Sequence, residues 1–227
     1  MNIQKIIVSS GPTREWIDPV RFISNASSGK MGYSIAEAAF QWIPNVIYIR
    51  GLTQPEYSRP NGSKIISVET TLEMRDAVLS EMQSNTMLIM AAAPADFRPK
   101  ESNDSKIKKE EGAEILTLEL IKNPDILSSV SETVSRNRFE DVLLVGFSAE
   151  TDDLHNYAME KLRRKNLDYI VGNYVSRQEK GFGDLTTSVV IFGKDGTKLE
   201  YGPETKEAVA SRVISYLRES ALGSVSR

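Results

Sequence analysis

Short runs of apolar residues recur along the chain and predict strands that are buried in a sheet. The run at 5–9 (KIIVS) ends just before Gly11-Pro12, and such turn-forming residues are typical of a strand end. The run at 86–93 (TMLIMAAA) is apolar throughout, which indicates a central strand of a parallel sheet. Further strands are predicted at 45–50, 64–68, 142–147 and 167–172, with an exposed or edge strand at 115–120 and a terminal hairpin of 187–192 with 197–201.

Between these runs, apolar residues return with the spacing of a helix that is buried on one face. Thr70 and Glu73 have the spacing of a capping box, so a helix is expected to begin there. Asn123-Pro124 predicts another helix start, with Asn123 as the N-cap. The remaining helices are predicted at 31–42, 152–165 and 205–217.

Strands and helices therefore alternate along most of the chain. This order predicts an α/β fold, a doubly wound, mostly parallel Rossmann-like sheet with helices on both faces and a C-terminal strand hairpin. We expect one domain over residues 1–227, with a polar tail from about 220 to 227. The stretches 11–29 and 94–112 show neither period and are predicted to be long polar loops.

Composition excludes several classes of function. The chain of 227 residues has a net charge of -3, which argues against a nucleic-acid-binding surface. It contains no cysteine and one histidine, His155, so thiol catalysis and a multi-histidine metal site are absent. No apolar run approaches the roughly 20 residues of a membrane span. With no signal peptide after Met1, we expect a soluble, cytoplasmic protein that does not bind membranes.

Ligands of doubly wound sheets bind beyond the carboxyl ends of the strands, so the loops after strands carry the candidate site. The segment 24–32 (SNASSGKMG) leads into a helix, whose N-terminal N–H groups and dipole favour an anion. It is not a P-loop, because Ser24 replaces the first glycine and Met31 replaces the hydroxyl residue. A solvated loop that caps a helix is the alternative.

The preceding segment 11–25 concentrates charged residues in a loop. Arg14 and Arg21 are candidates for binding phosphate or carboxylate, although a surface network of ion pairs explains the same residues equally well. A loop of this length within a compact domain is usually functional.

Two later loops add candidates. Ala92 and Ala93 end a buried strand and would let a flat ligand approach the backbone, with Asp96 placed for a ribose hydroxyl or for a water on Mg²⁺. The lysines of K-x-K-K suit triphosphate oxygens, but 100–111 has four lysines and four acids, so a solvated loop is the default. The basic residues of 161–166 complement a helix dipole without any ligand.

Taken in order, these segments closely resemble the phosphopantothenoylcysteine synthetase family. The matching stretches between about 11 and 183 are GPTRE, DPVRFISNASSGKMG, AAAPADFRPK, KIKK, IKNPDIL, VGFSAET, KLRRKNLDYIVGN and GFG. The resemblance implies an amide-forming ligase that joins 4′-phosphopantothenate to cysteine. The phosphopantothenate carboxylate would attack the α-phosphate of CTP, or less plausibly of ATP, and cysteine would then attack the acyl-nucleotidylate. It also implies Mg²⁺ held mainly by the triphosphate, with no direct protein ligand, and a homodimer in which one subunit completes the pantetheine pocket of the other.

The resemblance also assigns roles to individual residues. Asn25 resembles the asparagine that holds the acyl-nucleotidylate, and Lys106 resembles the first lysine of K-x-K-K, tied to phosphates and amide formation. The substrate-phosphate residues would be Arg21, Ser28, Gly29 and Lys30, and the nucleotide-binding residues Gly11, Ala92, Ala93, Asp96, Lys106, Phe147, Lys161 and Lys165.

The chain departs from the family pattern at Trp16, Pro94, Ser148 and in G-F-G-D-L-T-T, which leaves base preference and loop shape open. In many bacteria such a domain follows a flavin-dependent decarboxylase, so this is a stand-alone synthetase or an excised domain. The alternative function is a nucleotide-binding regulatory module without catalysis, against which Asn25 and Lys106 speak. An oxidoreductase is disfavoured because G-x-G-x-x-G is absent.

Overall fold

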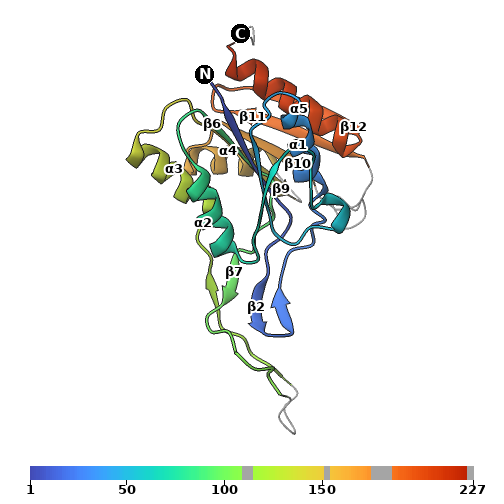
Figure 1. Cartoon of the computed structure of the whole chain (residues 1–227), viewed down its shortest axis with the longest axis vertical. Coiled ribbons are helices and arrows are strands. Elements are labelled where there is room, and N and C mark those ends of the chain that lie inside the picture. The colour runs from blue at the N-terminus through green and yellow to red at the C-terminus, as the bar shows by residue number, and fades with distance from the viewer. Residues whose placement is uncertain (109–114, 151–153, 175–185, 224–227) are drawn as a thin grey trace.

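The computed structural model describes residues 1–108, 115–150, 154–174 and 186–223. Among these residues, eight strands form one sheet in the order β12-β11-β10-β9-β6-β1-β4-β5 (Figure 1). The pairs from β10 to β5 are parallel, whereas β11 and β12 add an antiparallel hairpin. The strands are β1 (Lys5–Ser10), β4 (Val46–Arg50), β5 (Lys64–Ser67), β6 (Thr86–Met90), β9 (Leu143–Glu150), β10 (Tyr169–Tyr174), β11 (Thr187–Gly193) and β12 (Lys198–Glu204).

Helices cover both faces of this sheet, as the alternation of elements predicts (Figure 1). Successive residues of β1 show why: Ile6 and Val8 belong to one buried cluster, and Ile7 belongs to the cluster on the opposite face. The first cluster packs under α1 (Lys30–Phe40) and α5 (Lys206–Ala221), the second under α2 (Thr71–Glu81), α3 (Ile126–Asn137) and α4 (Leu154–Arg164). The predicted fold class is confirmed.

Helix starts test the local sequence signals. The capping box is confirmed. The Thr70 hydroxyl accepts from the Glu73 N–H at 3.1 Å, and the Glu73 carboxylate accepts from the Thr70 N–H at 3.4 Å. The prediction of Asn123 as an N-cap is wrong, because Asp125 caps α3 through the Ser128 N–H at 3.1 Å. Asn123 is instead buried, and its side chain is used elsewhere.

Other boundaries differ from the predicted ones. The stretch 115–120 is not a strand except at its end, where β8 (Leu120–Lys122) begins. The loop 51–63 contains a short 3₁₀ turn, η1 (Pro55–Tyr57). The helix predicted at 205–217 is longer, since α5 continues to Ala221. Predictions for Lys109, residues 151–153, the GFG segment at 181–183 and residues 224–227 lie outside the described residues.

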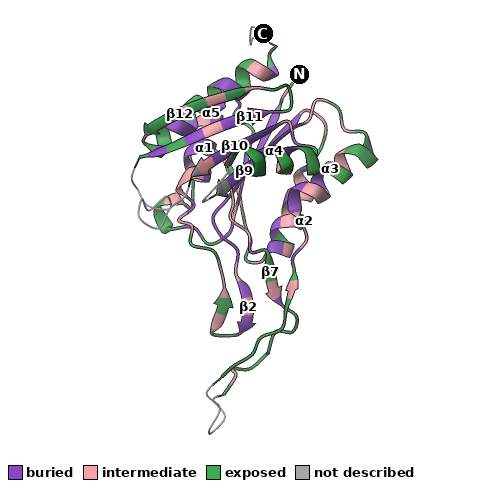
Figure 2. Cartoon of the chain, turned by 180° about the vertical axis from the view of Figure 1, so that it is seen from behind, coloured by how far each residue is buried: buried purple, intermediate pink, exposed green. Residues whose placement is uncertain are grey.

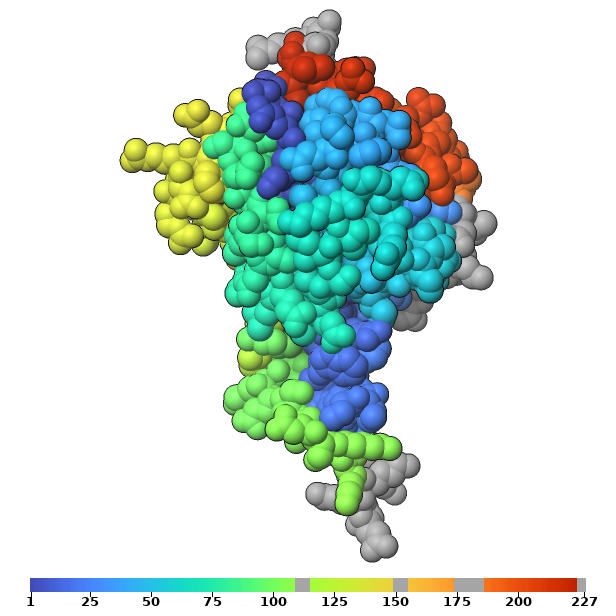
Figure 3. Space-filling model, viewed as in Figure 1, coloured from blue at the N-terminus to red at the C-terminus, as the bar shows by residue number. Residues whose placement is uncertain are grey.

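The two stretches predicted as loops build an arm that projects from the carboxyl edge of the sheet (Figures 1 and 3). In the first stretch, β2 (Glu15–Asp18) pairs with β3 (Arg21–Ile23), and in the second β7 (Phe97–Pro99) pairs with β8. The β2–β3 turn forms because Asp18 Oδ1 accepts from the N–H groups of Val20 and Arg21, each at 2.9 Å.

Asp18 also clamps the far part of the arm. Its Oδ2 accepts from Arg21 Nε at 2.9 Å and from the Ile107 N–H at 3.1 Å, and Arg21 Nη2 donates to Ile107 O at 2.8 Å. The hydrogen bond from the Arg21 side chain, helped by backbone N–H groups, lowers the pKa of Asp18 to about 2. Arg21 is therefore engaged in holding the arm together.

We expect this clamp to survive mild acid. A depressed folded-state pKa means that the clamp stabilises the arm above the ordinary value of 3.8 and is lost only as pH falls toward about 2. The NMR signal of the Arg21 Nε–H should hold its bonded position from neutral pH to about pH 3 and move as pH falls toward about 2. Asp18→Asn should shift that signal at every pH, whereas Asp104→Asn, an exposed acid of the same arm, should not. A signal that titrates with a pKa near 4 in the unmodified chain would contradict the clamp.

The arm carries much of the exposed apolar surface. Figure 2 shows green, exposed residues along its length. Ile115 is 83% exposed, and the other large exposed apolar side chains of the arm are Val20, Phe22, Phe97, Leu116, Leu118 and Leu120. Exposed apolar side chains that gather on one part of a protein are typical of interaction surfaces. Among the described residues, no helix has the length and apolarity needed to cross a membrane.

Candidate active site

A cavity of about 400 Å³ opens at the carboxyl edge of the sheet, between the end of β6 and the start of α1. It brings together residues from a predicted loop and from the ends of two predicted strands, which are far apart in the sequence. The predicted site residues that line it are Asn25, Ser28, Gly29, Lys30, Ala92, Ala93 and Phe147. The location follows the rule for doubly wound sheets. The strands that follow β1 in the sequence, β4 and β5, lie on one side of it, and β6 and β9 lie on the other, so the strand order reverses beside β1.

The start of α1 forms one wall of the cavity. Gly29 is the N-cap, with φ of 84°, and has no side chain to cap the helix, although Ser28 Oγ accepts from the Lys30 N–H at 3.3 Å. A Cβ at Gly29 would lie 2.5 Å from Thr53 Cγ2, and one at Gly32 would lie 2.6 Å from Ser10 Cβ, so both glycines let α1 start close to the sheet. N–H groups and the helix dipole at this position favour an anion, as the segment SNASSGKMG predicts.

Lys30 is held beside this helix start. Its Nζ lies 3.2 Å from Glu207 Oε1 of α5 and 5.8 Å from the centre of the Tyr57 ring. Burial acts to raise the pKa of Glu207, but its own backbone N–H and Lys30 outweigh burial, and the pKa is lowered. The Lys30 ammonium group is therefore fixed in place at the wall of the cavity rather than extended into solvent.

Asn25 connects the first loop to the end of β6. Its Nδ2 donates to Ala93 O at 3.2 Å and to Pro94 O at 3.0 Å. Gly11 supports the same turn through its carbonyl oxygen, which accepts from the Ala93 N–H at 2.9 Å. Gly11 lines neither this cavity nor the adjoining one, so its observed contribution is to position Ala93.

A second cavity of about 210 Å³ adjoins the first, and Ala92 and Phe147 line both. Asp96 and Lys165 line this second space, and the side chain of Asp96 is exposed at its rim. Lys165 Nζ lies 2.9 Å from Asp125 Oδ2. Burial acts to raise the pKa of Asp125, but Lys165 and the Ser128 N–H prevail, and the pKa is lowered.

Besides Gly11, three predicted residues lie apart from the cavities. Lys161 lines neither cavity, but its Nζ donates at 2.9 Å to the Oγ of Ser148, which lines the first. Arg21 is bound to Asp18 and Ile107, as described above. Lys106 is exposed on the arm and lines neither cavity of its own chain. The structure thus joins Asn25, α1 and the end of β6, but it does not join Lys106 to them within one chain.

The sequence interpretation missed other residues that line the first cavity. Lys206 is the first residue of α5 and is only 6% exposed, and Asn173 and Val189 come from β10 and β11. A lysine at the first position of a helix opposes the dipole, which is a signal that could have drawn attention to Lys206. Within the described residues, no group of three or more His, Cys, Asp and Glu side chains is arranged to hold a metal ion.

These features define a doubly wound α/β domain with a cavity at the switch point of its sheet, where a glycine-containing helix start forms one wall. The chain belongs to the family described as the DNA/pantothenate metabolism flavoprotein C-terminal domain, which matches residues 1–220. The match confirms the family relationship that the motifs indicate.

Individual relatives agree with this assignment. The chain is 44% identical over 210 residues to the coenzyme A biosynthesis bifunctional protein CoaBC of Bacillus subtilis (strain 168), covering 92% of this chain and 50% of the relative. The chain thus spans about half the length of the curated relatives it matches. A crystal structure of the C-terminal domain of CoaBC is 33% identical, with a TM-score of 0.76 over 98% of this chain and 100% of that one.

A DNA/pantothenate metabolism flavoprotein from Streptococcus pneumoniae shares the fold, with a TM-score of 0.79 over 96% of this chain and 99% of that chain. Its 23% identity supports the fold alone.

Proposed function

We propose that this chain is a phosphopantothenate–cysteine ligase of coenzyme A biosynthesis. The observation that carries the proposal is the cavity shared by Asn25, the glycine-capped start of α1 and the small residues at the end of β6. Membership of a family whose relatives include coenzyme A biosynthesis proteins supports it.

The chemistry has two balanced steps. A carboxylate oxygen of 4′-phosphopantothenate attacks the α-phosphorus of a nucleoside triphosphate, the bond to the bridging oxygen breaks, and pyrophosphate leaves. The amine of cysteine then attacks the acyl carbon, the acyl–phosphate bond breaks, and nucleoside monophosphate leaves as the amine loses a proton. Both steps depend on positioning and charge stabilisation more than on a strong base.

The cavity supplies both requirements. N–H groups at the start of α1, with Lys30 beside them, suit a phosphate group of the substrate. Asn25, held on the Ala93–Pro94 turn, is placed between that wall and the end of β6, where the acyl-nucleotidylate would lie.

The adjoining cavity suits the nucleotide. Ala92 leaves room for a flat base near Phe147, and Lys165 places a cation at the same rim as Asp96. We propose CTP as the co-substrate, with Mg²⁺ bound mainly by triphosphate oxygens and supplying charge neutralisation there. Oxygen-rich triphosphate is the kind of ligand that Mg²⁺ prefers, and it would compensate for the absence of an acidic cluster among the described residues.

We further propose a cytoplasmic homodimer. The exposed apolar side chains of the arm are the kind of surface that a second copy would cover. Lys106 lies outside the cavities of its own chain, so it can act on phosphates only at another site. An arm that reaches the partner subunit would bring Lys106 to the partner's cavity.

Pyrophosphate release tests the proposal. We expect pyrophosphate release to require phosphopantothenate and to be faster with CTP than with ATP at equal Mg²⁺. When cysteine is also present, mass spectrometry should detect the amide product. Omitting phosphopantothenate is the control, because a nonspecific triphosphatase would still hydrolyse the nucleotide. If folded protein releases no pyrophosphate with either nucleotide, the ligase assignment is wrong and a binding module takes its place.

A further inference from the structure

A buried acid below the cavity is not used by the chemistry described so far. Glu15 lies in β2 and is only 2% exposed. Glu15 Oε1 accepts three hydrogen bonds, from Thr13 Oγ1 at 3.0 Å, from Thr71 Oγ1 at 2.7 Å and from the Thr71 N–H at 2.9 Å. Thr13 and Thr71 are themselves buried.

The partners of Glu15 are hydroxyls and a backbone N–H rather than a cation. Thr71 is the first residue of α2, so the carboxyl group lies at the positive end of that helix dipole. Such a group orients the hydroxyls around it, because each hydroxyl has a single hydrogen to donate. With its hydrogen directed to Glu15, the Thr13 oxygen is left to act as an acceptor.

That acceptor receives the N–H of Ala95, at 3.0 Å from Thr13 Oγ1. The carbonyl of Ala95 is held as well, by Asn123 Nδ2 at 2.9 Å, and the Asn123 N–H donates to Asp96 O at 2.8 Å. The turn after β6 is thus fixed on both sides of Ala95. On the N–H side, Glu15 positions the acceptor, because Thr13 Oγ1 donates to Glu15 Oε1 while it accepts from Ala95.

The same turn carries Asn25, through the carbonyl oxygens of Ala93 and Pro94. A continuous chain of hydrogen bonds therefore runs from Glu15 through Thr13 and Ala95 to the backbone that orients the Asn25 amide. We propose that Glu15 is a positioning residue for the ligase reaction, and that it acts through this turn on Asn25. The inference rests on the proposed function, in which Asn25 holds the acyl-nucleotidylate.

Two substitutions separate position from charge. Glu15→Gln keeps an oxygen at Oε1, so it can retain the three hydrogen bonds while losing the charge. Glu15→Asp keeps the charge but is shorter by one methylene, so its oxygen cannot reach both threonines. Because misplacement by about 1 Å can cost roughly 100-fold in rate, we expect Glu15→Asp to lower kcat at least tenfold. We expect Glu15→Gln to stay within about threefold of the unmodified chain.

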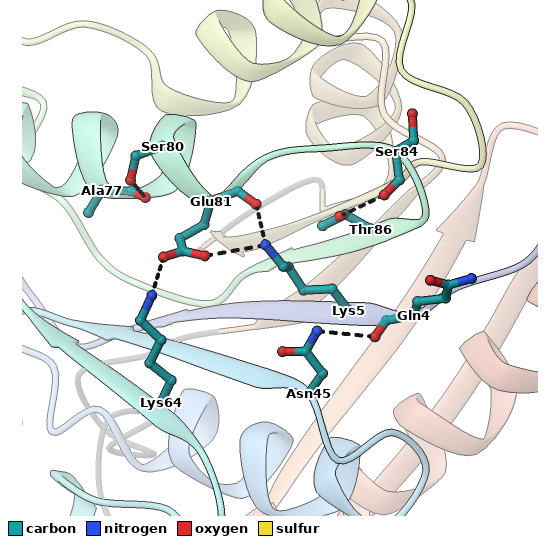
Figure 4. A network of polar contacts seen from close by, with 9 residues as sticks. All are labelled: Gln4, Lys5, Asn45, Lys64, Ala77, Ser80, Glu81, Ser84 and Thr86. Carbon is teal, nitrogen blue, oxygen red and sulfur yellow. Dashed lines mark hydrogen bonds and ion pairs between the residues drawn. The ribbon is translucent and has the colours of Figure 1, made fainter.

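A matched control exists at the opposite edge of the sheet. Figure 4 shows Glu81, which accepts from Lys5 Nζ at 3.3 Å and from Lys64 Nζ at 2.6 Å. Lys5 is the first residue of β1, so this network lies at the amino edge of the sheet, whereas the cavity lies at the carboxyl edge. Glu81→Asp shortens a partly buried acid in the same way, so it should lower the melting temperature without lowering kcat. A kcat that follows melting temperature across Glu15 and Glu81 variants would show a purely structural role and overturn the proposal.

Amide hydrogen exchange gives a readout that needs no activity. In Glu15→Asp we expect the Ala95 N–H to exchange at least about tenfold faster, and in Glu15→Gln to keep its protection. Unchanged exchange at Ala95 in Glu15→Asp would refute the positioning role even if the chain proves to be no ligase. Conversely, faster exchange with no ligase activity in the unmodified chain would leave the turn explained and the proposed function wrong. A lower kcat in Glu15→Gln than in Glu15→Asp would assign the effect to charge and also reject the proposal.

Discussion

Asn25→Asp is expected to lower the rate of amide formation by at least about 100-fold, comparable to the loss of a transition-state hydrogen-bond donor. The Asn25 amide nitrogen donates to two carbonyl oxygens, Ala93 O and Pro94 O. An aspartate has no such donor, so its oxygens would face those carbonyl oxygens and repel them. The new negative charge would also oppose the carboxylate and phosphates that the cavity is proposed to hold. Steady-state kinetics with phosphopantothenate, cysteine and CTP measures the effect.

Asn45→Asp is the matched control for this substitution. Asn45 is also exposed and also donates its amide N–H to a carbonyl, Gln4 O at 3.4 Å, but it lies at the amino edge of the sheet (Figure 4). It should keep the rate of the unmodified chain. Circular dichroism should show the folded state in both variants, because neither side chain is buried. A fully active Asn25→Asp would remove Asn25 from the mechanism.

The centre of the sheet was predictable because strands such as β1 and β6 are buried on both faces. An apolar run such as 86–93 can be recognised from the local sequence alone. The start of α2 can be recognised in the same way, from the capping box of Thr70 and Glu73. The N-cap of α3 was misplaced by two residues. Asn123 and Asp125 are both good capping residues, and only the tertiary contact of Asn123 with Ala95 decides between them.

The arm was missed for a different reason. β2, β3, β7 and β8 are three or four residues long, too short for a period of two to stand out from the surrounding polar residues. Their pairing depends on Asp18, whose carboxylate bonds both to its own turn and to Ile107, a residue remote in sequence. Local propensity contains no information on such a contact.

The site was predicted in part. The carboxyl-edge rule brings the loops after β1, β6 and β9 together, and the cavity confirms that Asn25, Ala93 and Phe147 meet there. The rule does not say which basic side chains reach the cavity. Lys30, the first residue of α1, lines the cavity. Lys161 does not line it and is hydrogen-bonded to Ser148 instead. That distinction depends on the packing of side chains, which a linear pattern does not encode.

Lys106→Gln is expected to lower turnover at least tenfold and to let acyl-nucleotidylate accumulate, because an ammonium group that neutralises phosphates would be lost. Lys100→Gln is the matched control. It removes an exposed lysine of the same arm that pairs with Glu119 at 2.9 Å, and it should keep normal turnover. Quenched-flow analysis of the bound nucleotide distinguishes accumulated intermediate from a failure to form it. Normal rates in Lys106→Gln would leave K-x-K-K as a solvated loop.

The position of Lys106 makes a stronger test possible. If each site combines Asn25 of one subunit with Lys106 of the other, a heterodimer of Asn25→Asp and Lys106→Gln subunits contains one doubly altered site and one intact site. Purified through two different tags, it should recover about half of the unmodified rate, although both parent homodimers are nearly inactive. If Lys106 instead folds back onto its own subunit, each site of the heterodimer carries one substitution and activity stays low. Recovery would therefore show that the arm reaches across, which explains why its apolar side chains are exposed in a single chain.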